Sequence, residues 1–223
     1  MGHKIHPKSF RLGVQGTWTS KWLIGKKKFP YLLEEDWSIR EYLKTRLKHT
    51  EVDSVAIERS GSSLKITIRV AKPGLVIGRG GKDIELLKKG VEKILTSIVK
   101  KYPKLAPSKR TLSLNVEEVP KQDTSATVMA QELVGQIERR NPFRRTMKRY
   151  LELILQNPKI SGAKIRMSGR LDGNEISRAE WLAKGKIPLQ TLRAHIDYGE
   201  ATAFCTYGAV GIKVWIYKGE FSA

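Results

Sequence analysis

Residues 75–84 read LVIGRGGKDI, in which three glycines, an arginine and a lysine lie between apolar residues. Glycines gathered in this way indicate that the backbone turns sharply or comes very close to another group. A P-loop is excluded, because Val76 stands where its first glycine is required and Asp83 stands where it needs a hydroxyl. A dinucleotide-binding fingerprint is excluded as well, because Asp83 also replaces its third glycine.

One anion-binding pattern does fit this loop. The run Ile77-Gly78-Arg79-Gly80-Gly81 is an I-G-x-x-G motif, and between two helices it resembles the loop of a KH domain. Its glycines allow the sugar–phosphate backbone of a single strand to lie against the protein backbone. Amides at the start of the next helix and nearby cations then face the phosphates. The expected RNA-binding residues are Gly78, Arg79, Gly80, Gly81 and Lys82.

The segments around the loop predict the fold of the first half, since their apolar residues recur at helical or at alternating spacing. The expected elements are a helix over 36–50, strands over 55–58 and 63–70, a short apolar turn over 75–77, a helix over 84–98 and a strand over 112–116. Asp36 or Ser38 is expected to cap the first helix. The order αββααβ is the type II arrangement of KH domains.

The second half predicts a different domain, which begins near Pro120. One helix is expected over 126–137, and a second begins at Asn141-Pro142, an N-cap followed by proline in the first turn. Strand-like segments follow at 163–171, 191–198, 201–207 and 211–217. The economical packing is a C-terminal α/β domain with two helices on a mostly antiparallel sheet, so the fold class is α+β. The expected division is a basic N-terminal extension over 1–38, the KH domain over 39–119 and the C-terminal domain over 120–223.

The charge of the chain points to a polyanionic partner. Among 223 residues, 42 are Lys or Arg and 22 are Asp or Glu, which gives a net charge of +20. Nucleic acid is the first candidate for neutralising such an excess, and an anionic membrane is the second. The single cysteine fits a reducing compartment, and the start of the chain has no apolar stretch of signal-peptide length.

A second basic motif, ERRNPFRRTMKR, covers residues 138–149. Arg139 and Arg140 end one helix, where cations suit the helix dipole, but Arg144 and Arg145 fall in the first turn of the next helix, where they oppose it. Each also has a like-charged residue four positions later. No neighbour in the sequence offsets this cost, whereas a phosphate chain would. The motif therefore predicts an RNA contact.

No catalytic or metal-binding set is evident. Asp172, Glu175 and Glu180 form no acid–base pair, and His3 and His6 have no partner cluster. We therefore expect neither an enzyme nor a cofactor, a metal or a small-molecule substrate.

Several stretches together resemble the bacterial-type small-subunit ribosomal protein three (S-three) family over nearly the full length. They are MGHKIHPKSFRLG, PGLVIGRGGKDI, QIERRNPFRRTMKR, SGRLDGNEISRAEWLAKGKIPLQTLRAHIDYG and TYGAVGIKVWIYKGE. The resemblance implies a structural constituent of the small ribosomal subunit that binds the 3′ head domain of 16S-type rRNA. It also implies mRNA as a partner, with small-subunit proteins ten, fourteen and two nearby and proteins four and five where mRNA enters.

The resemblance also implies roles for individual residues. Arg144, Arg145 and Lys148 match the family positions implicated in handling and helping to unwind incoming mRNA. Further RNA contacts are expected at Arg139, Arg140, Arg149, Lys4, Lys8 and Arg11. The expected location is the cytoplasmic ribosome, with an organellar ribosome as the alternative. The link KKYPKLAPSKR, residues 100–110, is longer and more basic than is usual in the family, so its contacts cannot be transferred.

Three other functions compete with this interpretation. A free-standing KH RNA chaperone or regulator would keep the glycine loop but would not need the second half. A membrane-surface protein would need an apolar face bordered by lysines, and no apolar run approaches the ~18 residues of a membrane span. An enzyme acting on RNA would need the acid–base or metal set that the sequence lacks.

Overall fold

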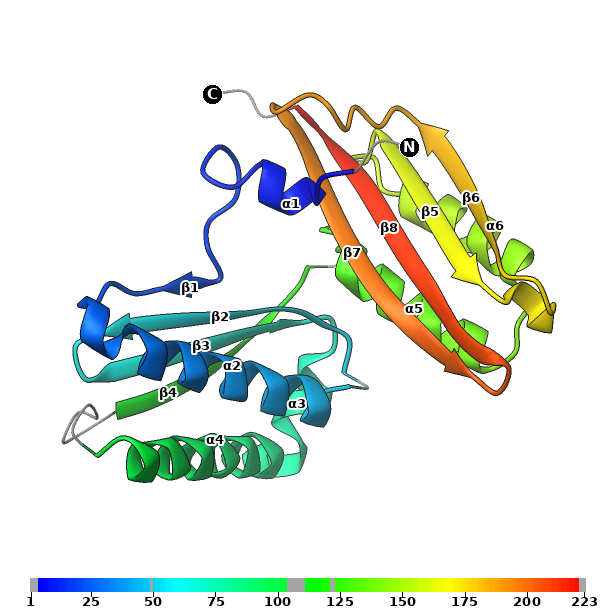
Figure 1. Cartoon of the computed structure of the whole chain (residues 1–223). Coiled ribbons are helices and arrows are strands. Elements are labelled where there is room, and N and C mark those ends of the chain that lie inside the picture. The colour runs from blue at the N-terminus through cyan, green and yellow to red at the C-terminus, as the bar shows by residue number, and fades with distance from the viewer. Residues whose placement is uncertain (1–3, 49, 104–110, 121–122, 221–223) are drawn as a thin grey trace. The chain divides into compact units, whose positions relative to one another are not determined.

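The computed structural model describes residues 4–48, 50–103, 111–120 and 123–220, and the chain forms two compact units (Figure 1). One unit is Trp18–Val119, and the other combines Met1–Thr17 with Pro120–Ala223. The unit boundaries lie between Thr17 and Trp18 and between Val119 and Pro120, so the stretch 1–38 is shared between the two units. Most of the predicted link over 100–110 lies outside the described residues.

The first unit has the predicted order αββααβ, preceded by one short strand. Its elements are β1 (Ser20–Lys21), α2 (Phe29–Arg46), β2 (Val52–Ser60), β3 (Ser63–Val70), α3 (Pro73–Ile77), α4 (Lys82–Lys101) and β4 (Thr111–Glu118). The sheet order is β1-β2-β3-β4, with β2 and β3 antiparallel and β4 parallel to β3. This arrangement confirms the predicted type II KH fold.

Helix α2 begins seven residues before the predicted start, so the prediction that Asp36 or Ser38 caps it is wrong. A 3-10 turn at Lys26–Lys28 leads into the helix, and Pro30 lies in its first turn. Asp36 lies inside the helix and is buried. Its carboxylate accepts hydrogen bonds from Trp22 Nε1 (2.9 Å) and Ser20 Oγ (3.0 Å). This residue joins α2 to β1.

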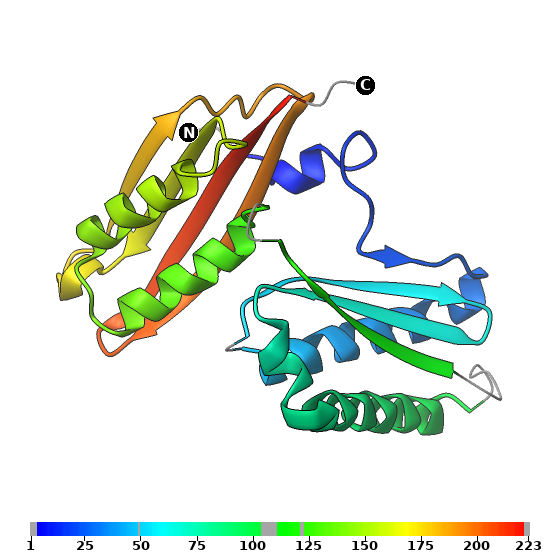
Figure 2. The same cartoon turned by 180° about the vertical axis from the view of Figure 1, so that it is seen from behind.

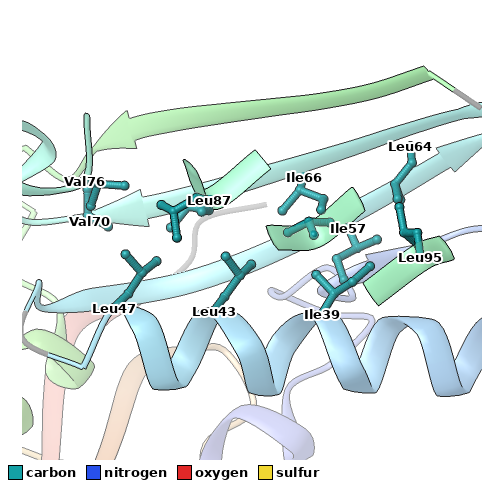
Figure 3. Packing of buried hydrophobic residues seen from close by; sticks show 12 residues of the cluster. Ile39, Leu43, Leu47, Ile57, Leu64, Ile66, Val70, Val76, Leu87 and Leu95 are labelled. Atoms are coloured by element: carbon teal, nitrogen blue, oxygen red, sulfur yellow. The ribbon is translucent and has the colours of Figure 1, made fainter. Parts of the chain in front are cut away.

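The core of the first unit forms between α2, α4 and one face of the sheet. Ile39 and Leu43 of α2, and Leu47 directly after its last residue, point toward the sheet (Figure 3). The residues that meet them from the sheet, α3 and α4 are Ile57, Leu64, Ile66, Ile68, Val70, Val76, Leu87, Val91 and Leu95. This packing fixes both α3 and α4, and hence the loop between them.

The second unit is a four-stranded antiparallel sheet with two helices on one face (Figure 2). Its elements are α1 (Pro7–Phe10), α5 (Ala126–Glu138), α6 (Phe143–Leu155), β5 (Gly162–Gly169), β6 (Arg178–Gly185), β7 (Ala194–Cys205) and β8 (Gly208–Glu220). The strand order is β6-β5-β8-β7. The predicted helices-on-sheet domain is therefore confirmed, although 191–198 and 201–207 contribute to one strand and β6 was not predicted.

Helix α5 lies close to β7 at its first turn. Ser125 caps the helix, and Asp197 Oδ2 of β7 accepts a hydrogen bond from the amide of Ala126 at 2.8 Å. A Cβ on Gly199 would lie 2.3 Å from the carbonyl oxygen of Ala126. Only glycine fits there, and this close approach sets the position of α5 on the sheet.

Candidate nucleic-acid interface

The glycine loop joins α3 to α4 through backbone that favours glycine. Gly78 ends α3 with φ 71°, and Gly80 has φ 64° in the 3-10 turn that follows. A Cβ on Gly78 would also lie 2.0 Å from Asp83 Oδ2, so no other residue fits without moving the start of α4. The glycines of the I-G-x-x-G motif are therefore required by the backbone conformation of this turn.

This loop presents donors and cations to the solvent. Arg79, Gly80 and Lys82 are exposed, and the described residues include no carboxylate in salt-bridge contact with either cation. The N-cap residue of α4 is Gly81, so no side chain caps the first turn of this helix. Free amides at the start of a 20-residue helix together with two cations suit a phosphate group. The structure thus brings all five predicted loop residues together.

The second basic motif lies on the first turns of α6. Phe143, Met147, Leu151 and Ile154 are buried against the sheet, so the residues between them, Arg144, Arg145 and Lys148, face the solvent. Among the described residues, neither Arg145 nor Lys148 has a carboxylate partner within salt-bridge distance.

Arg144 differs from its neighbours, and the prediction that nothing offsets its charge is wrong. Its Nε and Nη2 donate to the two carboxylate oxygens of Glu180 at 3.0 and 2.9 Å. Arg178 Nε also lies 3.1 Å from Glu180 Oε1. The hydrogen bonds from Arg144 lower the pKa of Glu180, and the bonds to Glu180 raise the pKa of Arg144. Both guanidinium groups lie near the ring of Phe143, at 5.6 and 5.8 Å from its centroid.

The start of α6 is not capped as predicted. Asn141 donates instead to Gln136 Oε1 at 2.7 Å, and the helix begins at Phe143 with Pro142 before it. The amide of Phe143 makes a long contact of 3.5 Å to Asp172 Oδ1. Asp172 is thus an acid beside a helix N-terminus, where it suits the dipole.

Most of the other residues predicted to contact RNA are accessible to solvent. The exposed ones include Arg139, Arg140, Arg149 and Lys4. Lys8 forms a salt bridge of 3.0 Å with Asp197 and keeps 45% of its side chain exposed.

The prediction that Arg11 contacts RNA is wrong, because this residue is only 3% exposed. Its guanidinium donates to the carbonyl oxygens of Ala194 (2.8 Å), Leu189 (2.9 Å) and Thr191 (2.9 Å). Burial lowers its pKa. Arg11 therefore ties the start of the chain to the C-terminal unit, which explains why residues 1–17 belong to that unit.

Within the described ranges, no three His, Cys, Asp or Glu residues gather closely enough to bind a metal ion. The same part of the chain contains no helix both long and apolar enough to cross a membrane.

Comparison with known proteins identifies both domains of the chain. A model of the KH domain matches residues 38–124, and a model described as Ribosomal protein S3, C-terminal domain matches residues 133–216. The small ribosomal subunit protein uS3 of Nitrosomonas eutropha is 44% identical over 99% of this chain and 96% of its own length. The uS3 proteins of Dichelobacter nodosus (45% identical, 86% of its length) and Synechocystis (44%, 87%) match the same 99% of the chain. The chain belongs to the uS3 family.

Membership of the uS3 family confirms that the chain is a ribosomal protein and not an enzyme. A free-standing KH regulator would have no reason to match uS3 proteins over both halves. Sequence reasoning nevertheless missed Arg178 and Glu180 as parts of the interface. They lie on β6, an edge strand whose residues are mostly exposed on both faces, so no apolar alternation marks it and its pairing with α6 could not be foreseen.

Proposed function

We propose that the chain is a structural constituent of the small ribosomal subunit, which binds small-subunit rRNA in the head and contacts incoming mRNA. The rRNA part is supported by membership of the uS3 family and by a positive charge spread over both units. The exposed glycine loop of the KH unit adds a surface suited to the phosphates of a single strand. The expected setting is the cytoplasmic ribosome.

The mRNA part of the proposal rests on one observation, the exposed first turns of α6. Arg144, Arg145 and Lys148 lie together there, and two of them have no acidic partner among the described residues. Buried Phe143 and Met147 hold this turn against the sheet, so the cations are presented on a rigid element. If these cations bind the phosphates of one mRNA strand, they would help to keep that strand apart from its complement. The sequence has no NTP-binding motif, so the movement itself would come from the ribosome.

The proposal also includes neighbours. Small-subunit proteins ten, fourteen and two would lie near the chain in the head. Proteins four and five would share the place where mRNA enters. Neither a membrane nor a small-molecule substrate is part of this function.

Translation through a stable mRNA hairpin tests the mRNA role. We expect Arg145→Gln plus Lys148→Gln to leave subunit incorporation intact and to slow elongation through the hairpin but not through unstructured mRNA. The matched control is Lys159→Gln plus Lys184→Gln, which removes the same charge from exposed positions outside this turn. Normal passage of the hairpin by the first variant would remove the mRNA role from the proposal.

A further inference from the structure

The sheet of the C-terminal unit has one face that α5 and α6 do not cover. Side chains alternate along each strand, and Ile165, Ile212 and Val214 on the helix side are buried. On the other side Arg166, Trp181 and Lys213 are exposed, whereas Ile196, Tyr198, Trp215 and Tyr217 form a buried cluster toward one end. Figure 2 shows both helices on the same side of the sheet. The N-terminal segment covers one end of the open side, where His6 packs edge-on against Tyr198.

Strand register places cations side by side on this open face. Arg166 of β5 lies opposite Lys213 of β8 and opposite Trp181 of β6. Lys164 is two residues before Arg166 on the same face, opposite Trp215. Like charges opposite one another destabilise a sheet. Desolvation first, and then Lys4 and Arg166, lower the pKa of Lys164.

Few acidic groups face these cations in the described part of the chain. Glu200, opposite Lys213, is the only carboxylate that the described strands place on this face, and it accepts a hydrogen bond from Tyr198 Oη at 2.8 Å. Neither Arg166 nor Lys213 has a carboxylate within salt-bridge distance among the described residues. A ligand that supplies negative charge would relieve this arrangement.

Aromatic rings lie among the cations. Trp181 is 59% exposed, and Lys164 Nζ lies 4.6 Å from the centroid of its ring. Phe204, 70% exposed, lies on the same face toward the far end of β7. The neighbours of Trp181 along its strand on this face are Ala179 and Ala183, so the rings do not form one continuous apolar patch of the kind that protein partners use.

We propose that the open face of the β6-β5-β8-β7 sheet is a second RNA-binding surface, on which Trp181 stacks an unpaired base while Arg166, Lys164 and Lys213 contact phosphates. Exposed aromatic residues on a sheet are a recurring means of binding single-stranded RNA, because every base has a face that stacks. Charge complementarity favours RNA over a protein partner here. The inference rests on the proposed function, and it adds a surface that neither the glycine loop nor α6 includes.

The test uses the full chain and a short, unstructured, fluorescently labelled single-stranded RNA. We expect Trp181→Ala to weaken binding by about fivefold or more, the lower end for loss of one stacked base, and Trp181→Phe to stay close to the original affinity. Arg166→Gln plus Lys213→Gln should lower the slope of log affinity against log salt by about 1.4, about 0.7 for each phosphate contact. Ultraviolet cross-linking of the original complex should attach RNA to β6.

Lys159→Gln plus Lys184→Gln is the matched control for Arg166→Gln plus Lys213→Gln, because it removes two exposed charges from positions outside the open face. It should change the salt slope less than the open-face pair does. If the open-face variants bind RNA like the original chain while Arg145→Gln plus Lys148→Gln binds more weakly, the inference is wrong and the proposed function stands.

Two further outcomes would also overturn the inference. Unchanged RNA affinity combined with loss of co-sedimentation with small subunits would mean that the open face docks another protein. A chain that binds no RNA even at low salt would remove the proposed function together with this surface.

Discussion

Replacing Glu180 by glutamine should tighten RNA binding at the start of α6. Glu180 is shared by Arg144 and Arg178, so two positive charges and one negative charge leave this group with one net positive charge. Glutamine has nearly the same shape but no charge, so the variant would carry two net positive charges at the same place. A local gain of affinity is therefore expected, although a salt bridge is lost.

Counterion release gives the size of the gain. Each phosphate contacted on a single strand contributes about 0.7 to the slope of log affinity against log salt. One added positive charge should steepen the slope by about 0.7, which means about fivefold tighter binding at about 0.1 M salt if the gain disappears near 1 M. Adding Arg144→Gln to Glu180→Gln restores one net positive charge and should return both values close to the original.

Fluorescence anisotropy of labelled single-stranded RNA over a salt series measures both quantities. Glu92→Gln is the control, since it makes the same charge change at an exposed position of α4. It lies ten residues after Lys82, the last residue of the glycine loop, about 15 Å along the helix axis, which exceeds the screening length of ~10 Å at 0.1 M salt. Unchanged or weaker binding by folded Glu180→Gln would refute the reasoning, because RNA would then not pass this turn.

Three other predictions follow from the geometry. Arg79→Asp plus Gly80→Asp should weaken RNA binding without unfolding the loop, because Gly80 has open space around it and aspartate tolerates its left-handed backbone; equal affinity at low salt would show that the loop is only a turn. Gly199→Ala should lower the free energy of unfolding by about 1–3 kcal/mol, because its Cβ would force α5 away from β7. Gly135→Ala, which places its Cβ in open space on α5, should raise the free energy of unfolding by about 0.5–1 kcal/mol. Equal denaturation midpoints of the two variants would contradict this. Arg59→Leu should cost about 3–5 kcal/mol, because it removes the partner of two buried carboxylates on α2; a loss below 1 kcal/mol in urea unfolding would argue against a buried ion network.

Much of the fold could be predicted because apolar periodicity reports burial. Ile39, Leu43 and Leu47 recur at helical spacing and do face the core, and the alternating residues of β3 do form a half-buried strand. The glycine loop was also foreseeable, since only glycine combines a positive φ with the close approach of Asp83 at Gly78. Local chemistry of this kind is visible in a sequence.

The remaining features depend on contacts between distant residues. Arg11 looks like any other basic residue near a terminus, but the carbonyl groups that bury it lie more than 175 positions later. Glu180 is 36 positions from Arg144, on a strand without apolar alternation. Asp36 seemed a helix cap because short polar side chains favour that position, yet its partners are Trp22, Ser20 and Arg59. Such partners become known only when the fold brings them together.

Sedimentation of the tagged full chain through a sucrose gradient tests the central claim most directly. A constituent of the small subunit should migrate almost completely with small subunits and whole ribosomes, and it should remain there after a moderate salt wash. A chain that stays at the top of the gradient with assorted bound RNAs would contradict the claim and would indicate a free RNA-binding protein.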